Sequence, residues 1–434
     1  MDRSFGLKIL KLKNFKMRAS CFFAILLVSG SLSAVAENWP RFRGNNGDGK
    51  ADCKIPTEWK NADYRWSINL AEEGHGSPSV WGNRVFLNTA TDGGKTREVI
   101  CVNAKTGKLE WSRSYPSKNH KTHRFNSFAS STPAVDAKRV YSVWGHSKEL
   151  KVTAHTQSGR LVWEKDLGGV TGGHGFAVSP IVFQDLVIVP NDQEKGGGAH
   201  YGLDSSTGEI VWKVPRASKR LTYSTPCIFS TPSGKQELIF TNWWLGFTSM
   251  EPLTGKKLWE LSVFGRPHSE RAISSPIVAG DLVLGVCGFT TLDKHLVAIR
   301  PASVSKDGKA REIWRMEETM PHIPTPLLSK NRLYLWADNG VITCLRPQTG
   351  EKVWKARIEG VKDTFFGSPV LAGNTIFCVS AYGQVVAIAD SDEFKQLGVT
   401  DLKQTCRSTP ALANGDLYLR TGEQLICIKG DSKI

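Results

Sequence analysis

The fold of this chain of 434 residues can be predicted from one stretch, Val102-Asn103-Ala104-Lys105-Thr106-Gly107-Lys108-Leu109-Glu110-Trp111. It has the pattern of an apolar strand, a tight Thr-Gly turn and a second strand with Trp four residues after the glycine. Glycine suits the turn because it adopts positive φ without a Cβ clash. The tryptophan offers a large flat surface for burial. The stretch therefore predicts a β-hairpin with an aromatic anchor.

The same hairpin pattern returns along the chain. A unit of this kind cannot bury its own tryptophan, so we expect the copies to pack on one another. Further copies lie at residues 157–163, where Ser replaces Thr, and at 201–212, 253–259 and 348–354.

A second repeated signal is Ser-Pro or Thr-Pro followed by apolar residues, which occurs eight times at intervals of 41 to 55 residues. Short runs rich in Val and Ile, four to a unit, lie between successive dipeptides, and no stretch has sustained helical periodicity. Four strands per unit is typical of a propeller blade. The dipeptides begin at Ser77, Thr132, Ser179, Thr225, Ser275, Thr325, Ser368 and Thr409. The sequence predicts an all-β fold, a single eight-bladed β-propeller of four-stranded antiparallel blades.

The two ends of the chain are expected to share the last blade. Its unit has only three strand-like runs, and residues 64–70 supply a fourth, since Trp66 stands 45 residues before Trp111. Pairing the ends leaves no unpaired edge. We therefore assign residues 1–36 to a signal peptide, 37–63 to an N-terminal extension and 64–430 to the propeller.

Residues 1–36 have a basic start, an apolar run at 21–28 and Ala-Val-Ala before Glu37, the pattern of a secretory signal. The alternative, an uncleaved anchor, is disfavoured because the apolar run is short. Cys21 lies inside that run, so no lipoprotein attachment site is expected, and no later segment is apolar enough to span a membrane. The mature chain is expected to be exported, to the periplasm or out of the cell.

The chain has 56 basic and 41 acidic residues, a net charge of +15. Removal of the signal, with six basic residues and one acidic residue, leaves 50 and 40, a net charge of +10. This excess favours anionic partners, and the alternative is a generally soluble basic surface. No basic run with interleaved aromatics indicates nucleic acid.

Eight of the nine cysteines follow the signal. Most are expected to be free and buried because they lie in apolar runs, and a Cys53–Cys406 disulfide is the alternative. No CxxC motif or Cys/His group has zinc spacing, so no metal residue is assigned.

The Thr-Gly-x-x-x-Trp turns, the Ser/Thr-Pro strand starts and the eightfold count resemble the pyrroloquinoline-quinone (PQQ) type β-propeller repeat family over residues 38–430. That family includes quinoprotein alcohol dehydrogenases and non-catalytic propellers such as the lipoprotein of the outer-membrane β-barrel assembly machine, BamB. Residues 39–44 (Trp-Pro-Arg-Phe-Arg-Gly) are similar to the start of exported members. The resemblance implies docking between neighbouring blades by Trp111, Trp163, Trp212, Trp259, Trp314 and Trp354.

A quinoprotein dehydrogenase needs calcium held by oxygen ligands, a general-base carboxylate and surfaces that enclose the quinone. The family commonly uses a disulfide between adjacent cysteines, and this chain has no Cys-Cys pair. The loops between blades are also expected to be short, with no insertion long enough to cover a cofactor. No catalytic or cofactor-binding residue is assigned, and neither PQQ nor calcium is expected.

Residues just ahead of each Ser/Thr-Pro should cluster at one face of the ring, near its channel. Such a convergent set could bind a small anion or an acidic loop; the alternative is that each residue covers its own blade end. The set is His75, Arg124, His174, Phe176, Tyr223, Arg271, His322, Phe366 and Arg407.

The leading functional hypothesis is an exported, non-catalytic scaffold of the cell envelope that binds a protein or an anionic ligand. One alternative is a PQQ-dependent alcohol or sugar dehydrogenase with a divergent pocket. Another is a carbohydrate-binding propeller, for which an exposed Trp243–Trp244 pair would suit sugar stacking.

Overall fold

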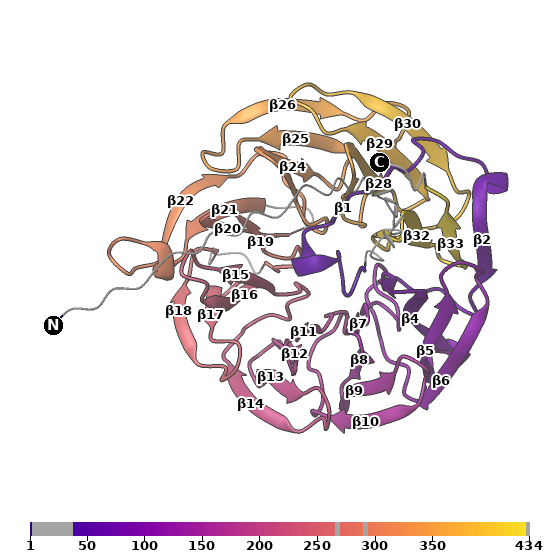
Figure 1. Cartoon of the computed structure of the whole chain (residues 1–434), viewed down its shortest axis with the longest axis horizontal. Helices are drawn as coiled ribbons and strands as arrows, with labels where there is room; N and C mark the ends of the chain where they lie inside the picture. Colours follow the sequence, from indigo (N-terminus) through magenta and orange to yellow (C-terminus); the bar gives the residue numbers. More distant parts are fainter. Residues whose placement is uncertain (2–37, 265–269, 290–293, 431–434) are drawn as a thin grey trace. The chain divides into compact units, whose positions relative to one another are not determined.

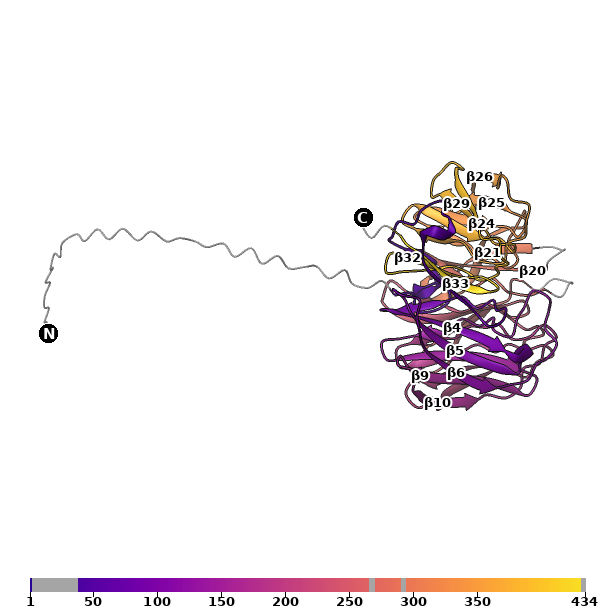
Figure 2. The same cartoon turned by 90° about the vertical axis from the view of Figure 1, so that its right-hand side faces the viewer.

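The computed structural model describes residue 1 and residues 38–264, 270–289 and 294–430. The chain divides into the units Met1–Val35 and Ala36–Ile434. The second unit contains eight β-sheets that follow one another around a central channel (Figure 1), and Figure 2 shows them from the side. The predicted eight-bladed propeller is confirmed. The expected signal peptide falls outside the described residues, apart from Met1.

Six blades are each built from four antiparallel strands that are consecutive in sequence. The first three comprise β3 (Ser79–Trp81), β4 (Arg84–Thr91), β5 (Thr96–Asn103) and β6 (Leu109–Pro116); β7 (Ala134–Val135), β8 (Arg139–His146), β9 (Glu149–Thr156) and β10 (Leu161–Asp166); and β11 (Ile181–Phe183), β12 (Leu186–Val189), β13 (Gly198–Asp204) and β14 (Ile210–Arg216). The next three comprise β15 (Cys227–Ser230), β16 (Gln236–Asn242), β17 (Gly246–Met250) and β18 (Lys257–Leu261); β19 (Ile277–Ala279), β20 (Leu282–Gly288), β21 (Lys294–Arg300) and β22 (Arg311–Met316); and β23 (Leu327–Ser329), β24 (Arg332–Trp336), β25 (Val341–Leu345) and β26 (Lys352–Arg357).

The last two blades take strands from the start of the chain. The seventh adds β1 (Lys50–Ala51), parallel to β27, to β27 (Val370–Ala372), β28 (Thr375–Val379), β29 (Gln384–Ala389) and β30 (Gln396–Asp401). The eighth combines β31 (Ala411–Ala413), β32 (Asp416–Arg420) and β33 (Gln424–Ile428) with β2 (Tyr64–Asn69). Strand β2 pairs antiparallel with β33, with Trp66 opposite Cys427. Closure of the ring by both chain ends is confirmed.

The described helices are short 3-10 turns: η1 (Asn45–Gly47), η2 (Asn61–Asp63), η3 (Asp92–Gly94) and η4 (Ala302–Val304). Among the described residues, no helix has the length and apolar character needed to cross a membrane.

In six of the eight blades, the tryptophan of the outer strand links its blade to the next one. The indole Nε1 donates to a carbonyl in the following blade, because a largely buried N–H needs an acceptor. These bonds run from Trp66 to Ala104 (2.8 Å), Trp111 to Gln157 (3.0 Å), Trp163 to Ser205 (3.0 Å), Trp212 to Pro252 (3.1 Å), Trp314 to Pro347 (3.1 Å) and Trp354 to Ser391 (3.2 Å). Trp259 differs because residues 301–310 replace the Thr-Gly turn of the fifth blade. Its Nε1 donates instead to Glu237 of its own blade at 2.9 Å.

The turn glycine meets two requirements at once. Gly208 has φ +75°, and a Cβ there would lie 2.6 Å from the ring of Trp163 in the preceding blade. Gly107, Gly159, Gly255 and Gly350 likewise have positive φ and lie against the preceding tryptophan. The Thr-Gly turn and the tryptophan are therefore two halves of one contact between blades.

The Ser/Thr-Pro residues form a ring around the channel. The backbone N–H of each donates to the side-chain oxygen of the next, and among the described residues seven of the eight steps close at 2.9 to 3.0 Å. The step from Thr409 to Ser77 joins the two ends of the chain. Proline has no N–H to donate, so the residue before it supplies both the donor and the acceptor.

The N-terminal segment crosses the channel and binds the inner ends of distant blades; it appears in indigo at the centre of Figure 1. Arg41 donates to the carbonyl of Pro226 at 2.9 Å, and Arg43 donates to those of Pro326 and Pro369 at 3.0 and 3.2 Å. Burial lowers the pKa of each guanidinium to about 10, so both stay protonated at neutral pH. Residues 39–44 are therefore anchored across the channel by these two arginines.

The eight cysteines among the described residues are free and buried. The alternative of a Cys53–Cys406 disulfide is wrong. The Cys406 thiol instead points to the carbonyl of Arg420, 3.2 Å from its sulfur, and burial raises the pKa of that thiol to about 11.

Substituting Gly208 by Ala tests the contact between blades. We expect Gly208→Ala to lower the free energy of unfolding by about 1 to 3 kcal/mol more than Gly234→Ala, the range typical of overpacking. Gly234 is the matched control because it also has positive φ (+83°) but has nothing within 4 Å of an added Cβ. Urea unfolding measures both variants, and equal losses would show that the indole contact contributes nothing.

Candidate functional site

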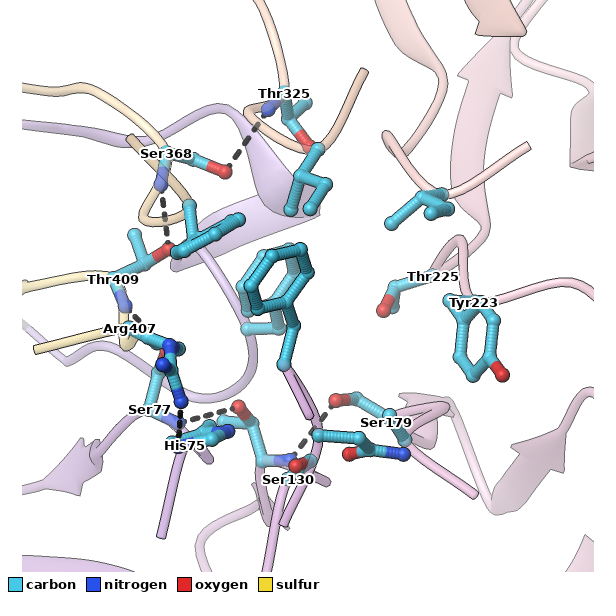
Figure 3. A pocket seen from close by; sticks show the side chains of 18 of the residues that line it. His75, Ser77, Ser130, Ser179, Tyr223, Thr225, Thr325, Ser368, Arg407 and Thr409 are labelled. Atoms are coloured by element: carbon cyan, nitrogen blue, oxygen red, sulfur yellow. Dashed lines mark hydrogen bonds between the residues drawn. The ribbon is translucent and has the colours of Figure 1, made fainter. Parts of the chain in front are cut away.

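The channel contains a pocket of about 250 Å³. Seven of the eight Ser/Thr-ring residues contribute to its wall, and Phe42 of the N-terminal segment also lines it. Figure 3 shows His75 and Arg407 side by side, with Tyr223 on the opposite side of the view. The pocket is therefore bounded by the inner ends of the blades and by the segment that crosses the channel.

The structure brings most of the predicted channel-face residues together. The pocket is lined by His75, His174, Tyr223, Arg271, His322, Phe366 and Arg407. Arg124 and Phe176 lie outside this lining: Arg124 stacks on Phe125 with its Cζ 4.6 Å from the ring centroid, and Phe176 is buried in a core cluster.

Residues 117–133, between β6 and β7, contribute to the pocket wall, with Phe125 and Asn126 among the lining residues. Phe125 from this segment packs against Phe366, which precedes the seventh blade, with ring centroids 4.6 Å apart. The segment is held by His174, whose carbonyl accepts from the backbone N–H of His123 at 3.2 Å and from the amide of Asn126 at 2.7 Å. The expectation of short loops is wrong for this segment, which runs from the end of β6 to the start of β7 and contributes residues to the pocket wall.

The pocket also contains residues outside the set predicted from the sequence. These are apolar or uncharged side chains such as Phe42, Asn126, Ile273, Phe289 and Ile323. The length of the segment after β6 can be read from the sequence, whereas the position of Phe42 in the pocket cannot.

On one side of the pocket, Glu73, His75 and Arg407 form a cluster. His75 Nε2 lies 3.2 Å from the Glu73 carboxylate and 3.3 Å from Arg407 Nη1, and the guanidinium is 3.6 Å from the same carboxylate. Burial lowers the pKa of His75, so its ring is neutral at neutral pH. The Arg407 Cζ also lies 5.7 and 5.6 Å from the ring centroids of Phe125 and Phe366, within cation–π range.

A second cationic group lies ahead of the fourth and fifth blades. Arg271 forms an ion pair with Glu194, and Arg220 lies 3.6 Å from the same carboxylate. His174 stacks on His123 with ring centroids 4.7 Å apart. Burial, with Arg271 nearby, lowers the pKa of His174 to about 4, so this ring is also neutral at neutral pH.

The chemistry of the wall favours an anion. Among the described residues that line the pocket, none is Asp or Glu, while Arg271 and Arg407 both line it. Calcium prefers carboxylate and carbonyl oxygens, so the donor set of the wall does not fit the calcium of a quinoprotein. An anion with an aromatic part fits both the guanidinium groups and the phenyl rings.

The Trp243–Trp244 pair does not form an exposed double platform. Trp243 is buried, whereas Trp244 is 40% exposed, and the Lys219 ammonium lies 3.2 Å from a Trp244 ring centroid.

The fold is that of an eight-bladed PQQ-like propeller, and a pocket lies in its channel. A family model described as outer membrane protein assembly factor BamB matches residues 57–124, 97–356 and 302–397, and the chain belongs to this family.

Individual relatives are distant. BamB of Escherichia coli (strain K12) is 20% identical over 301 residues, covering 69% of this chain and 73% of BamB. Polyvinylalcohol dehydrogenase of Sphingopyxis sp. (strain 113P3) is 24% identical over 163 residues, covering 36% of this chain and 25% of that enzyme. A europium-containing methanol dehydrogenase superposes with a TM-score of 0.65 at 13% identity, covering 90% of this chain and 98% of the enzyme, which shows the shared fold.

The imidazole of His322 is expected to make stability depend on pH. Burial lowers its pKa in the folded chain to about 4, against an ordinary value of 6.5. Between these values the unfolded chain binds a proton that the folded chain does not, so stability falls as pH drops from 6.5 toward 4.

We expect His322→Asn to reduce the loss of stability between pH 7.5 and pH 5 by up to about 2 kcal/mol. Urea unfolding at both pH values, with each protein compared with itself at pH 7.5, removes the effect of altered packing. An unchanged loss would mean that His322 is not held neutral.

Proposed function

We propose that this chain is an exported, non-catalytic propeller of the cell envelope that binds a small anionic ligand with an aromatic part in its channel pocket. The observation that carries the proposal is that Arg271 and Arg407 both line the pocket, whose described wall residues include no Asp or Glu. An anionic oxygen in the pocket can accept from their guanidinium N–H groups, and a hydrogen bond to a charged group contributes about 1.5 to 3 kcal/mol.

Arginine suits this role because its guanidinium presents five N–H donors in a fixed fork that matches carboxylate and phosphate. The carboxylates of Glu73 and Glu194 each engage only part of such a fork. The rings of Phe125 and Phe366 add a surface on which an aromatic group can pack. The pocket is therefore suited to a ligand with one charged and one apolar end.

The place in the envelope is supported by two observations. Residues 1–36 have the pattern of a secretory signal, and the family is described as an outer membrane protein assembly factor. The same description supports binding of an envelope protein as part of the scaffold role.

A PQQ-dependent dehydrogenase is the second candidate, favoured by the fold shared with methanol dehydrogenase over 90% of this chain. The absence of Asp and Glu from the described pocket wall disfavours it, since both the calcium and the general base of such an enzyme need carboxylates.

Benzoate provides a simple test of anion binding. We expect wild-type protein to bind benzoate, and Arg407→Ala and Arg271→Ala each to weaken the affinity by about tenfold or more, because a hydrogen bond to a charged group contributes about 1.5 to 3 kcal/mol. Arg311→Ala is the control, since this exposed arginine pairs with Asp307 in the fifth-blade insertion. Titration calorimetry measures the affinities, with benzyl alcohol as the uncharged ligand. Equal binding of benzoate and benzyl alcohol, or by all three variants, would refute the anion site.

Incubation with PQQ and calcium separates the two candidates. After gel filtration we expect no calcium-dependent, stoichiometric quinone absorbance, because the wall presents no carboxylate to the ion. A retained chromophore at one per chain, reduced on addition of an alcohol, would establish the dehydrogenase.

A further inference from the structure

Three buried side chains of different chemistry meet in the fifth blade, outside the pocket wall. Cys287 on β20 and His295 on β21 are direct partners in the antiparallel register. Glu270 precedes Arg271, whose backbone pairs with Gly288 at the end of β20. The three side chains therefore come from adjacent segments at one end of the sheet.

The donor atoms of these side chains lie close together. The Cys287 sulfur, a His295 ring nitrogen and a Glu270 carboxylate oxygen are all within 4.8 Å of one another. Nε2 of His295 is 3.6 Å from the Glu270 carboxylate. Their relative exposures are 0% for Cys287 and His295 and 1% for Glu270. The ion pair holds the imidazole and the carboxylate close together in the absence of a metal.

The surroundings hold the imidazole in place. The ring of Phe264 stacks on His295 at 5.5 Å between centroids and 17° between planes. Cys287 belongs to an apolar cluster with Phe264 and Phe247. A metal bound here would be enclosed by hydrocarbon, with its ligands fixed by packing.

We propose that Glu270, Cys287 and His295 form a zinc-binding site. Thiolate, imidazole and carboxylate are the three donor types that zinc takes from proteins. Ligand distances of about 2.0 to 2.3 Å place tetrahedral donors roughly 3.3 to 3.8 Å apart. The donor atoms of the three side chains therefore move closer together by about 1 Å when zinc binds. The fourth position is left to water or another donor. The Cys287 thiol releases its proton to solvent as the zinc–sulfur bond forms.

This site is independent of anion binding in the channel. Arg271 lines the pocket, but its neighbour Glu270 does not. Metal content can therefore be measured without any pocket ligand, and the two proposals can fail separately.

Zinc content tests the site directly. Full-length protein is incubated with zinc, dialysed and measured by atomic emission, and we expect one zinc per chain. Competition with a chromophoric chelator should show an affinity reduced by about 100-fold or more in Cys287→Ser, since loss of a partner that merely orients a ligand already costs about 10- to 100-fold. Cys344→Ser is the matched control, because Cys344 is equally buried on β25 of the sixth blade. Circular dichroism verifies that the variants are folded.

Cobalt substitution tests the ligand set in the wild-type protein, even if a variant fails to fold. We expect bound Co²⁺ to give a thiolate charge-transfer band in the near ultraviolet and the intense visible bands of a four-coordinate ion. The charge-transfer band should vanish in Cys287→Ser and persist in Cys344→Ser. Wild-type protein that retains less than stoichiometric zinc, a cobalt spectrum without the thiolate band, or equal affinities for the two serine variants would overturn the proposal.

Discussion

The indole of each outer-strand tryptophan needs a flat surface and a hydrogen-bond acceptor, and in most blades the next blade supplies both. The surface is the bare backbone of a turn glycine, as at Gly208 beneath Trp163. The acceptor is a carbonyl of the same turn. Each contact runs from one blade to the next in chain order. The tryptophan of the last blade therefore needs a docking surface on the first blade. Trp66 meets that need by docking on the turn that contains Gly107.

The residues that line the pocket occupy positions that this repeated contact leaves open. The Ser/Thr ring fixes the inner end of each blade, but the residues just before it differ from blade to blade. They place guanidinium groups at Arg271 and Arg407 and aromatic rings at Tyr223 and Phe366. Phe42 enters the same pocket from the N-terminal segment. A symmetric scaffold thus carries an asymmetric pocket.

The sequence predicted the fold because its two signals, Thr-Gly-x-x-x-Trp and Ser/Thr-Pro, are local and repeated. Seven of the nine positions predicted to meet at the channel line the pocket, since equivalent positions in a ring converge, whereas Arg124 and Phe176 do not. It did not predict that Phe125 would line the pocket, because the path of residues 117–133 depends on contacts with His174 and Phe366.

The proximity of Glu270, Cys287 and His295 could not be predicted from the sequence either. These residues share no metal-binding spacing along the chain, and strand register alone brings them together. The exception at Trp259 was partly visible. The missing turn in the fifth blade could be read from the sequence, but the substitute acceptor on Glu237 could not.

The N-terminal segment has a consequence for the order in which the chain folds. Arg43 is made early in synthesis, yet its acceptors belong to Pro326 and Pro369, made near the end. Strand β2 likewise pairs with β33, which is synthesised near the end of the chain. Pairings between such distant parts of a chain carry a large loop-closure entropy and form slowly. The segment that contains Arg43 and β2 is therefore expected to be fixed late in folding, and a chain that stops short of its final blade would have neither a closed ring nor the complete pocket.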